Sequence, residues 1–310
     1  MADASVGKEQ MKKLTLLTSL LLAAIICLAG CNTATPDATA TPQSGITVTD
    51  LSGVTVTLDK APTKVVSLVP SVTELLFEMG AGSLICGRDS YSNYPSQAAE
   101  IPVMGDYNGP NLELIVAAQP DVVFTAGKLQ QDAEDKLRQA GIVVINAEAG
   151  TLEQVTTSIA LLGDVCGKKE KAQQMVSQFR AGVDAIKALD IKKVSAYYMV
   201  SSGEYGEWSV GPGSFIFDAL TLGGAELITK DMEYSYPQYS VESIVQKNPY
   251  VIIADSNTTL EYLQSHEALG ELDAVKNGRV IIMDADTVSR PTLRFISAIK
   301  ECLERMHAFN

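Results

Sequence analysis

Two glutamates occupy equivalent positions in two similar segments of the chain. Residues 111–124 read NLELIVAAQPDVVF and residues 240–253 read SVESIVQKNPYVII, with five identities in fourteen positions. Each segment combines a polar cap, an early Glu, a short amphipathic stretch, a Pro and a β-branched run, which predicts a short helix followed by a buried strand. Glu113 and Glu242 would then be exposed carboxylates on two lobes of one plan, suited to a two-sided partner. One alternative is that the two segments resemble each other by chance, because a helix followed by a strand is a common unit. Another is that each Glu only complements the dipole of its own helix.

Aromatic residues make up only 6% of the chain, and eight of the eleven Tyr and one Trp fall in loops rich in Gly, Pro or Ser. Rigid rings in loops provide large contact areas at low entropic cost, which is typical of recognition surfaces. For Tyr94 and Tyr239 we favour the alternative that the ring anchors its own loop. The eight loop aromatics are Tyr91, Tyr94, Tyr107, Tyr205, Trp208, Tyr234, Tyr236 and Tyr239.

Residue types that would support catalysis or metal binding do not occur in suitable patterns. The two histidines, His266 and His307, lie far apart in the sequence, whereas a transition-metal site needs clustered His and carboxylates. Residues 211–214 (GPGS) lack the spacing of a nucleophile elbow. Residues 163–169 (GDVCGKK) are one residue short of a phosphate-binding loop and end in Lys. We therefore predict neither an enzyme nor a resident metal or cofactor.

The first thirty residues predict an export signal. Lys12 and Lys13 precede an apolar run from Leu14 to Leu28, and small residues then lead to Cys31. This pattern is typical of a bacterial lipoprotein whose Cys31 carries lipid; the alternative is an ordinary secretory peptide with an incidental cysteine. We expect residues 1–30 to be an N-terminal extension and signal peptide, and residues 31–45 to be a flexible tether. The protein would be lipid-anchored on the extracytoplasmic face of the cell membrane.

The bulk composition is that of a globular protein large enough for two domains, with 46% hydrophobic and 20% charged residues among 310. A net charge of −13 argues against nucleic acid as a partner. Beyond the signal and Cys31, three cysteines remain, an odd number without metal-binding spacing. This argues against a disulfide framework or a zinc site, and we expect Cys166 and Cys302 to be small core residues.

The order of predicted elements is that of an α/β protein with two lobes. Residues 46–150 contain a hairpin over 46–58, a strand over 64–70, a helix opened by a Ser71–Glu74 capping box, and further alternating elements. Residues 151–191 hold two long helical patterns without a strand, and alternation resumes over 192–310. We predict two mainly parallel sheets flanked by helices and joined by a long spine helix. Such a spine resists large closure, so the cleft between the lobes should be largely preformed.

The lipoprotein signal, the spine helix and the repeated unit together resemble the helical-backbone (class III) substrate-binding proteins of ABC importers for vitamin B12, siderophores and haem. Residues 64–74 (KVVSLVPSVTE) are similar to the family's opening strand and helix, and residues 89–95 (DSYSNYP) to a loop of its vitamin B12-binding member. The resemblance covers the chain from about Thr63 onward. It implies a periplasmic-binding-protein-like fold, with Glu113 and Glu242 docking to arginines on an ABC permease dimer. We expect a monomer.

The same resemblance implies which residues contact a ligand. It carries this role to Tyr91 and, by a looser alignment, to three more aromatic residues; residues 286–290 occupy the place of the last ligand-contacting loop. Two departures concern Ala126, where the vitamin B12-binding member has a Trp, and Leu222, where it has a cysteine that would pair near Cys302. The implied ligand-binding residues are Tyr91, Tyr107, Trp208, Tyr236, Asp286, Thr287, Val288, Ser289 and Arg290.

At three of these positions, Tyr107, Trp208 and Tyr236, an aromatic residue stands where the vitamin B12-binding member also has an aromatic residue. This favours a flat, largely apolar macrocycle as ligand. We expect a substrate-binding component that captures a corrinoid, a vitamin B12-like ligand, and delivers it to the permease. A ferric siderophore is the weaker alternative, because an anionic ligand favours several basic residues, and the candidates are Arg88, Lys128, Arg290 and Arg294. Haem is another alternative, with Tyr91 or Tyr236 as axial ligand. A sensor lipoprotein without transport is the alternative from a different functional class.

Overall fold

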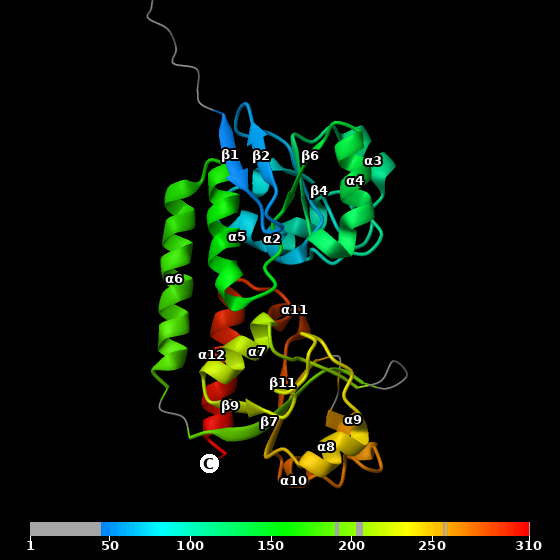
Figure 1. Cartoon of the computed structure of the whole chain (residues 1–310), viewed down its shortest axis with the longest axis vertical. Helices are drawn as coiled ribbons and strands as arrows, with labels where there is room; N and C mark the ends of the chain where they lie inside the picture. The colour runs from blue at the N-terminus through cyan, green and yellow to red at the C-terminus, as the bar shows by residue number, and fades with distance from the viewer. Residues whose placement is uncertain (1–44, 190–191, 203–206, 257, 259, 310) are drawn as a thin grey trace, which may run out of the picture. The chain divides into compact units, whose positions relative to one another are not determined.

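The N-terminal lobe is built on a four-stranded parallel sheet (Figure 1). The computed structural model of the protein describes residues 45–189, 192–202, 207–256, 258 and 260–309. In the sheet, the strands run in the order β4 (Ile85–Arg88), β3 (Val65–Ser67), β5 (Val122–Thr125) and β6 (Val143–Asn146). An antiparallel hairpin of β1 (Ile46–Thr49) and β2 (Thr55–Leu58) precedes it, as the alternating pattern predicted.

Helices cover both faces of this sheet. Strand residues are buried almost throughout, as expected for parallel strands with helices on either side. The core on one face joins Ile115 and Leu137 to the strands, and the core on the other face includes Leu75. The helical elements of this lobe are α2 (Pro70–Glu78), η1 (Gly82–Leu84), η2 (Ser96–Glu100), α3 (Leu112–Ala118), η3 (Gly127–Gln130) and α4 (Gln131–Gln139).

The C-terminal lobe repeats the plan with a mixed sheet. Its strand order is β11 (Val280–Met283), β10 (Val251–Asp255), β7 (Val194–Ser201) and β8 (Trp208–Ser209), with β9 (Ala225–Leu227) also pairing with β7. All pairings are parallel except that of β7 with β8. The helices are α7 (Phe215–Leu222), α8 (Val241–Lys247), α9 (Leu260–Ser265), α10 (Asp273–Lys276), α11 (Ala285–Val288) and α12 (Leu293–His307).

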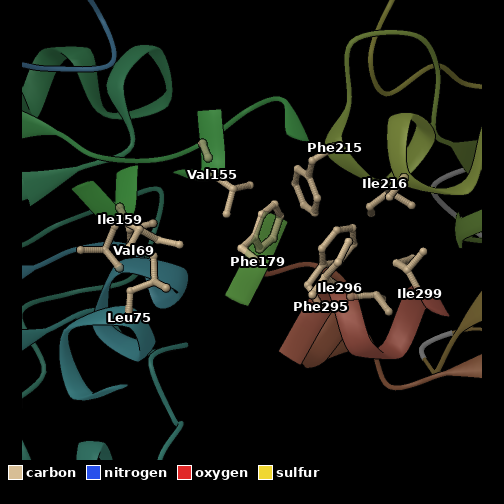
Figure 2. Packing of buried hydrophobic residues seen from close by; sticks show 14 of the residues in the cluster. Val69, Leu75, Val155, Ile159, Phe179, Phe215, Ile216, Phe295, Ile296 and Ile299 are labelled. Carbon is tan, nitrogen blue, oxygen red and sulfur yellow. The ribbon is translucent and has the colours of Figure 1, made fainter. Parts of the chain in front are cut away.

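Three long helices connect the lobes through one continuous apolar core. Helix α5 (Leu152–Val165) packs against the spine helix α6 (Lys169–Lys187), and the C-terminal helix α12 returns to pack on α6 as well. Figure 2 shows Phe179 of α6 between the two halves of this core, with Ile159 on the N-terminal side and Phe295 on the C-terminal side. Because both lobes share buried side chains, the predicted spine helix is a packed element rather than a free hinge. Both α5 and α6 fall within the predicted linker, whose boundaries stay a prediction.

The repeated unit forms the same structure in both lobes. Helices α3 and α8 each have seven residues, and the side chains of Asn111 and Ser240 cap them by accepting a hydrogen bond from a backbone N–H. Each helix ends at a residue in the left-handed region, Gln119 with φ 49° and Asn248 with φ 39°, followed by Pro. A buried strand follows in each case. Matching caps, turns and strands support the two-lobe prediction beyond the sequence identities alone.

One predicted helix start was wrong. Helix α2 begins at Pro70, its N-cap is Val69, and no side chain caps it. Ser71 and Glu74 are buried instead of forming the expected capping box, because the helix entry is packed under the second lobe and Glu74 contacts residues of that lobe. A true capping box occurs at α5, where Thr151 and Gln154 exchange hydrogen bonds. Within the described ranges, no helix combines the length and apolar character needed to cross a membrane.

Candidate ligand-binding cleft

Two adjoining cavities lie where the lobes meet. The inner chamber, of about 320 Å³, is lined by Tyr107 and Glu148 of the first lobe and by side chains of the second, including Tyr198 and Tyr236. The outer chamber, of about 290 Å³, is lined by residues that include Tyr91. Tyr107, Glu148 and Ser289 line both chambers, so the two form one cleft. Its volume falls in the range of small-molecule sites, and it lies beyond the carboxyl ends of parallel strands, where α/β folds gather ligands.

Tyr107 is held in this cleft by hydrogen bonds to its side chain and to its backbone. Its hydroxyl donates to Glu148, with distances of 2.7 and 2.8 Å to the two carboxylate oxygens. The buried side-chain amide of Gln130 donates to the carbonyl oxygens of Tyr107 and Leu68, at 2.6 and 3.1 Å, and its oxygen accepts from the Ala126 N–H. Burial and the neighbouring carboxylate raise the pKa of Tyr107 far above its usual value, so the phenol is always a donor. Gln130 thus ties the backbone of Tyr107 to that of Ala126 and Leu68.

Glu148 is the main site residue that the sequence analysis missed. It follows strand β6 in the small-residue stretch Ala147–Gly150, and it has no motif around it. Burial raises its pKa to about 7, with the negative charge of Asp89 adding to the effect and the Tyr107 hydrogen bond opposing it. A carboxyl group just after the end of a parallel strand, between small residues, was the available signal.

The second lobe contributes two tyrosines and one aspartate to the inner chamber. Tyr236 is partly exposed, and burial of its hydroxyl end, followed by the charge of Glu148, raises its pKa to about 12. Tyr198 of β7 is 1% exposed, and its hydroxyl has no hydrogen-bond partner among the described residues. Asp255 ends the neighbouring strand β10 and lines the same chamber. Neither Tyr198 nor Asp255 was predicted as a site residue.

The predicted loop 286–290 reaches the cleft, but not all of its residues face it. Val288 lines the inner chamber, Ser289 lines both chambers, and Asp286 and Arg290 line the outer one. Thr287 lines neither chamber. Its hydroxyl donates at 2.6 Å to Asp284, the N-cap residue of α11, and accepts a hydrogen bond from Arg294 at 3.1 Å. The loop therefore presents both polar and apolar side chains to the cleft.

Two residues of this loop also tie the lobes together at the outer chamber. Asp286 accepts from Asn93 Nδ2 at 2.8 Å and forms an ion pair with Arg290 at 2.9 Å. Arg290, with 4% of its side chain exposed, donates to the Tyr91 carbonyl at 3.0 Å. We name Tyr91, Asn93, Asp286 and Arg290 the interlobe clasp. In this arrangement Arg290 supports the wall of the cleft. Its neighbour Ser289 is exposed and is therefore more accessible to a ligand than Arg290 is.

A second interlobe contact lies on α2. Glu74, which is 2% exposed, accepts from Arg294 Nε and Nη2 at 2.8 and 2.6 Å and from the Thr292 hydroxyl at 2.8 Å. The Arg294 guanidinium also lies 3.7 Å from the ring centroid of Tyr94. The hydrogen bonds explain how a buried carboxylate is tolerated, because all of its charge is compensated by donors from the other lobe. Tyr94 thereby anchors its own loop, as the favoured alternative held.

The remaining predicted residues lie in different surroundings. Tyr91 is 59% exposed at the rim of the outer chamber. Trp208 is half-buried in β8, pairs with Ser201 of β7, and lines neither chamber. Tyr205 and the predicted lipidation site Cys31 fall outside the described residues. Cys166 and Cys302 are buried core residues with free thiols, as predicted.

Both predicted docking glutamates are exposed. Glu113 and Glu242 are the second residues of α3 and α8, so each carboxylate lies in the first turn of its helix and complements the helix dipole. Beside them, the helices expose apolar side chains, Leu114 and Val116 on α3 and Val245 on α8. A carboxylate flanked by exposed apolar groups on each lobe is a surface suited to protein contact.

Known proteins similar to this chain share this architecture. An uncharacterized ABC transporter substrate-binding lipoprotein of Bacillus subtilis, YvrC, is 29% identical over 96% of this chain and 98% of its own. The vitamin B12-binding protein of Vibrio campbellii is 31% identical over 78% and 88% of the two chains.

Solved structures show the same fold. The periplasmic vitamin B12-binding protein BtuF of Vibrio cholerae has a TM-score of 0.70 and 25% identity, covering 80% of this chain and 98% of its own. The periplasmic haem-binding protein RhuT of Roseiflexus superposes with a TM-score of 0.71 at 19% identity, over 79% and 98% of the two chains. The second likeness concerns the fold alone.

The family of periplasmic binding proteins matches residues 65–287, which is most of the chain. The match includes the opening strand, both copies of the repeated unit and the spine helix. It confirms the predicted resemblance to the helical-backbone substrate-binding proteins of ABC importers, and the predicted α/β fold with two lobes. The chain therefore belongs to the periplasmic binding protein family, whose members bind solutes and are not enzymes.

Proposed function

We propose that this protein captures a corrinoid in the cleft between its lobes and delivers it to the permease of an ABC importer. The observation that carries the proposal is the lining of the cleft, where Tyr91, Tyr107 and Tyr236 come from both lobes and the walls of the inner chamber are mostly apolar. Such walls suit a flat macrocycle better than a compact ion. The identity to a vitamin B12-binding protein over most of both chains supports the same ligand class.

The charge distribution in the cleft argues against a strongly anionic siderophore. Of the four basic candidates, Arg88 donates to backbone carbonyls of its own loop and Arg294 is paired with Glu74. Lys128 is exposed and lines neither chamber. Arg290 lines the outer chamber but is paired with Asp286. A triply negative ligand would find little compensating charge there.

Delivery requires a partner in the membrane. In this proposal Glu113 and Glu242 contact basic residues on the two halves of a permease dimer, and the lipid on Cys31 keeps the protein at the outer face of the membrane. The two glutamates occupy equivalent positions on the two lobes, which suits a partner with two-fold symmetry. A sensor without transport would need no such matched pair.

Titration with three ligands tests the proposal. Calorimetry of the purified protein with cyanocobalamin, haemin and a ferric catecholate siderophore should give saturable one-to-one binding with cyanocobalamin. Tight binding of haemin instead would move the ligand class to haem, with Tyr91 as the accessible axial donor. Transport of the ligand by cells that carry the gene, and its loss on deletion, separates import from sensing.

A further inference from the structure

The polar side chains that line the inner chamber are acids, phenols and a serine. Its lining includes two carboxyl groups, Glu148 and Asp255, and three phenols, Tyr107, Tyr198 and Tyr236. Among the described residues that line it, none is a Lys, an Arg or a His. Carboxylate oxygens in such a lining accept hydrogen bonds from a ligand and disfavour a negatively charged group.

Tyr198 supplies a donor that the protein itself does not use. Its side chain is 1% exposed, and its hydroxyl is without a hydrogen-bond partner within the described part of the chain. Burial, followed by the charge of Asp255, raises the pKa of Tyr198 well above its usual value, so the hydroxyl stays protonated. Buried hydroxyls are rarely left unpaired, and Tyr198 is a lining residue of the chamber, so we expect its hydroxyl to turn toward an acceptor on a ligand that fills the chamber.

The acceptors lie on both sides of the chamber. The two oxygens of Glu148 share one hydrogen from Tyr107, whereas a carboxylate can accept about four. Asp255 is on β10, which pairs in parallel with β7, and Ile253, two residues before Asp255, is the pairing partner of Tyr198. One acceptor therefore comes from the first lobe, and an acceptor and a donor come from adjacent strands of the second.

We infer that the inner chamber is a carboxamide-selective subsite, in which Glu148 and Asp255 accept N–H groups of a neutral amide and Tyr198 donates to its carbonyl oxygen. A carboxylate of the same shape has no N–H to give and would place a negative charge beside the Glu148 carboxylate at pH 8, above the pKa of Glu148. A primary amide matches both the acceptors and the donor. Glu148 is the specificity-determining residue, because it faces the ligand from the lobe opposite to the other two.

This inference rests on the proposed function, which it sharpens. The rim of a corrinoid carries primary carboxamides, whereas haem carries carboxylates. The same aromatic walls could hold either ring, so the polar groups of the inner chamber would decide between them. Hydrogen bonds to charged groups and the repulsion of a carboxylate together predict a discrimination of about 10- to 100-fold between an amide and its acid.

The test uses cyanocobalamin and a set of derivatives in each of which one rim carboxamide is hydrolysed to the acid. Calorimetry at pH 8 with the full-length protein should show that at least one acid derivative binds about 10- to 100-fold more weakly than cyanocobalamin. Glu148→Gln keeps the shape and the bond from Tyr107 but removes the charge, and should reduce this difference to a few-fold. Tyr198→Phe should weaken cyanocobalamin while leaving the difference between amide and acid in place.

Glu153→Gln is the matched control, since Glu153 is an exposed glutamate on α5, outside the cleft. It should retain the wild-type discrimination. Equal binding of all the acid derivatives and cyanocobalamin, or discrimination that survives Glu148→Gln and Asp255→Asn together, would overturn the inference. Thermal unfolding of each variant checks that the fold is kept.

A different result separates this inference from the proposed function. If cyanocobalamin does not bind but haem compounds do, the corrinoid proposal fails, and haemin is then compared with its neutral bis-amide. Preference for the bis-amide, lost in Glu148→Gln, would uphold the chamber as an amide-selective subsite. Preference for haemin itself, or no binding of either ring, would overturn both.

Discussion

The Tyr107 hydroxyl lies 2.7 and 2.8 Å from the two oxygens of Glu148, and this pair forms the wall shared by the inner and outer chambers. One phenolic hydrogen stabilises the carboxylate but does not offset the loss of hydration, because burial raises the pKa of Glu148 to about 7. We therefore expect the Tyr107–Glu148 pair to affect both ligand specificity and protein stability.

The first prediction concerns stability and pH. The pKa of Glu148 is about 7 in the folded protein against an ordinary value of 4.5, so the folded state binds the proton more tightly. The free energy of unfolding should therefore fall as pH rises from about 4.5 to 7, by up to about 3 kcal/mol from this group. Glu148→Gln cannot titrate and should remove this slope.

Urea unfolding of the wild type and of Glu148→Gln at pH 5, 6, 7 and 8 measures the difference. The free energy of unfolding of the variant, relative to that of the wild type, should increase as pH rises. Groups that do not interact with Glu148 titrate alike in both proteins and cancel in this comparison. Parallel curves across the range would mean that Glu148 titrates normally.

The second prediction concerns the buried ion pair between the lobes. Glu74→Gln leaves the Arg294 guanidinium without its charged partner in a partly buried position, with 30% of its side chain exposed, and should lower the free energy of unfolding by about 2 kcal/mol. Glu153→Gln, at an exposed position on α5 away from this contact, is the matched control and should change it by less than about 0.5 kcal/mol. Similar losses in both variants would show that the interlobe contact contributes little.

This contact also shows where sequence reasoning failed. Ser71 and Glu74 have capping-box spacing, yet Glu74 is turned toward Arg294, 220 residues later in the chain. Local spacing cannot reveal such a partner, since it depends on how the lobes pack. The same holds for Glu148 and Asp255, which line one chamber from different lobes.

The elements themselves were far more predictable. Repetition of a capped helix, a Pro and a buried strand predicted α3–β5 and α8–β10, because caps and turns are local. The apolar stripe of α6 predicted the spine for the same reason. Aromatic loop positions placed Tyr91, Tyr107 and Tyr236 in the cleft, whereas Trp208 lies outside its two chambers. The carboxyl groups were missed because charged residues are frequent in loops and only the fold shows which ones line a cavity.

The third prediction concerns docking. Replacing both Glu113 and Glu242 by Lys should abolish ligand uptake by cells, because each would then repel the basic surface of the permease, while ligand affinity stays unchanged. Glu153→Lys is the matched control, since Glu153 is also exposed and is the second residue of its helix. It carries the same change in helix-dipole interaction and should transport normally.

Two measurements separate docking from binding in these variants. Calorimetry gives the affinity of the purified protein, and uptake of radiolabelled ligand gives transport. Lost affinity in the double variant would contradict the separation of a binding cleft from a docking surface. Full uptake by the double variant would remove the glutamates from the docking surface.

The central claim is that the cleft binds a corrinoid, and a titration of the purified protein with cyanocobalamin tests it most directly. Calorimetry should show saturable one-to-one binding at micromolar affinity or tighter, and the fluorescence of Trp208, the one tryptophan of the chain, can be followed in parallel. Absence of binding, together with tight binding of haemin or a ferric siderophore, would contradict the claim.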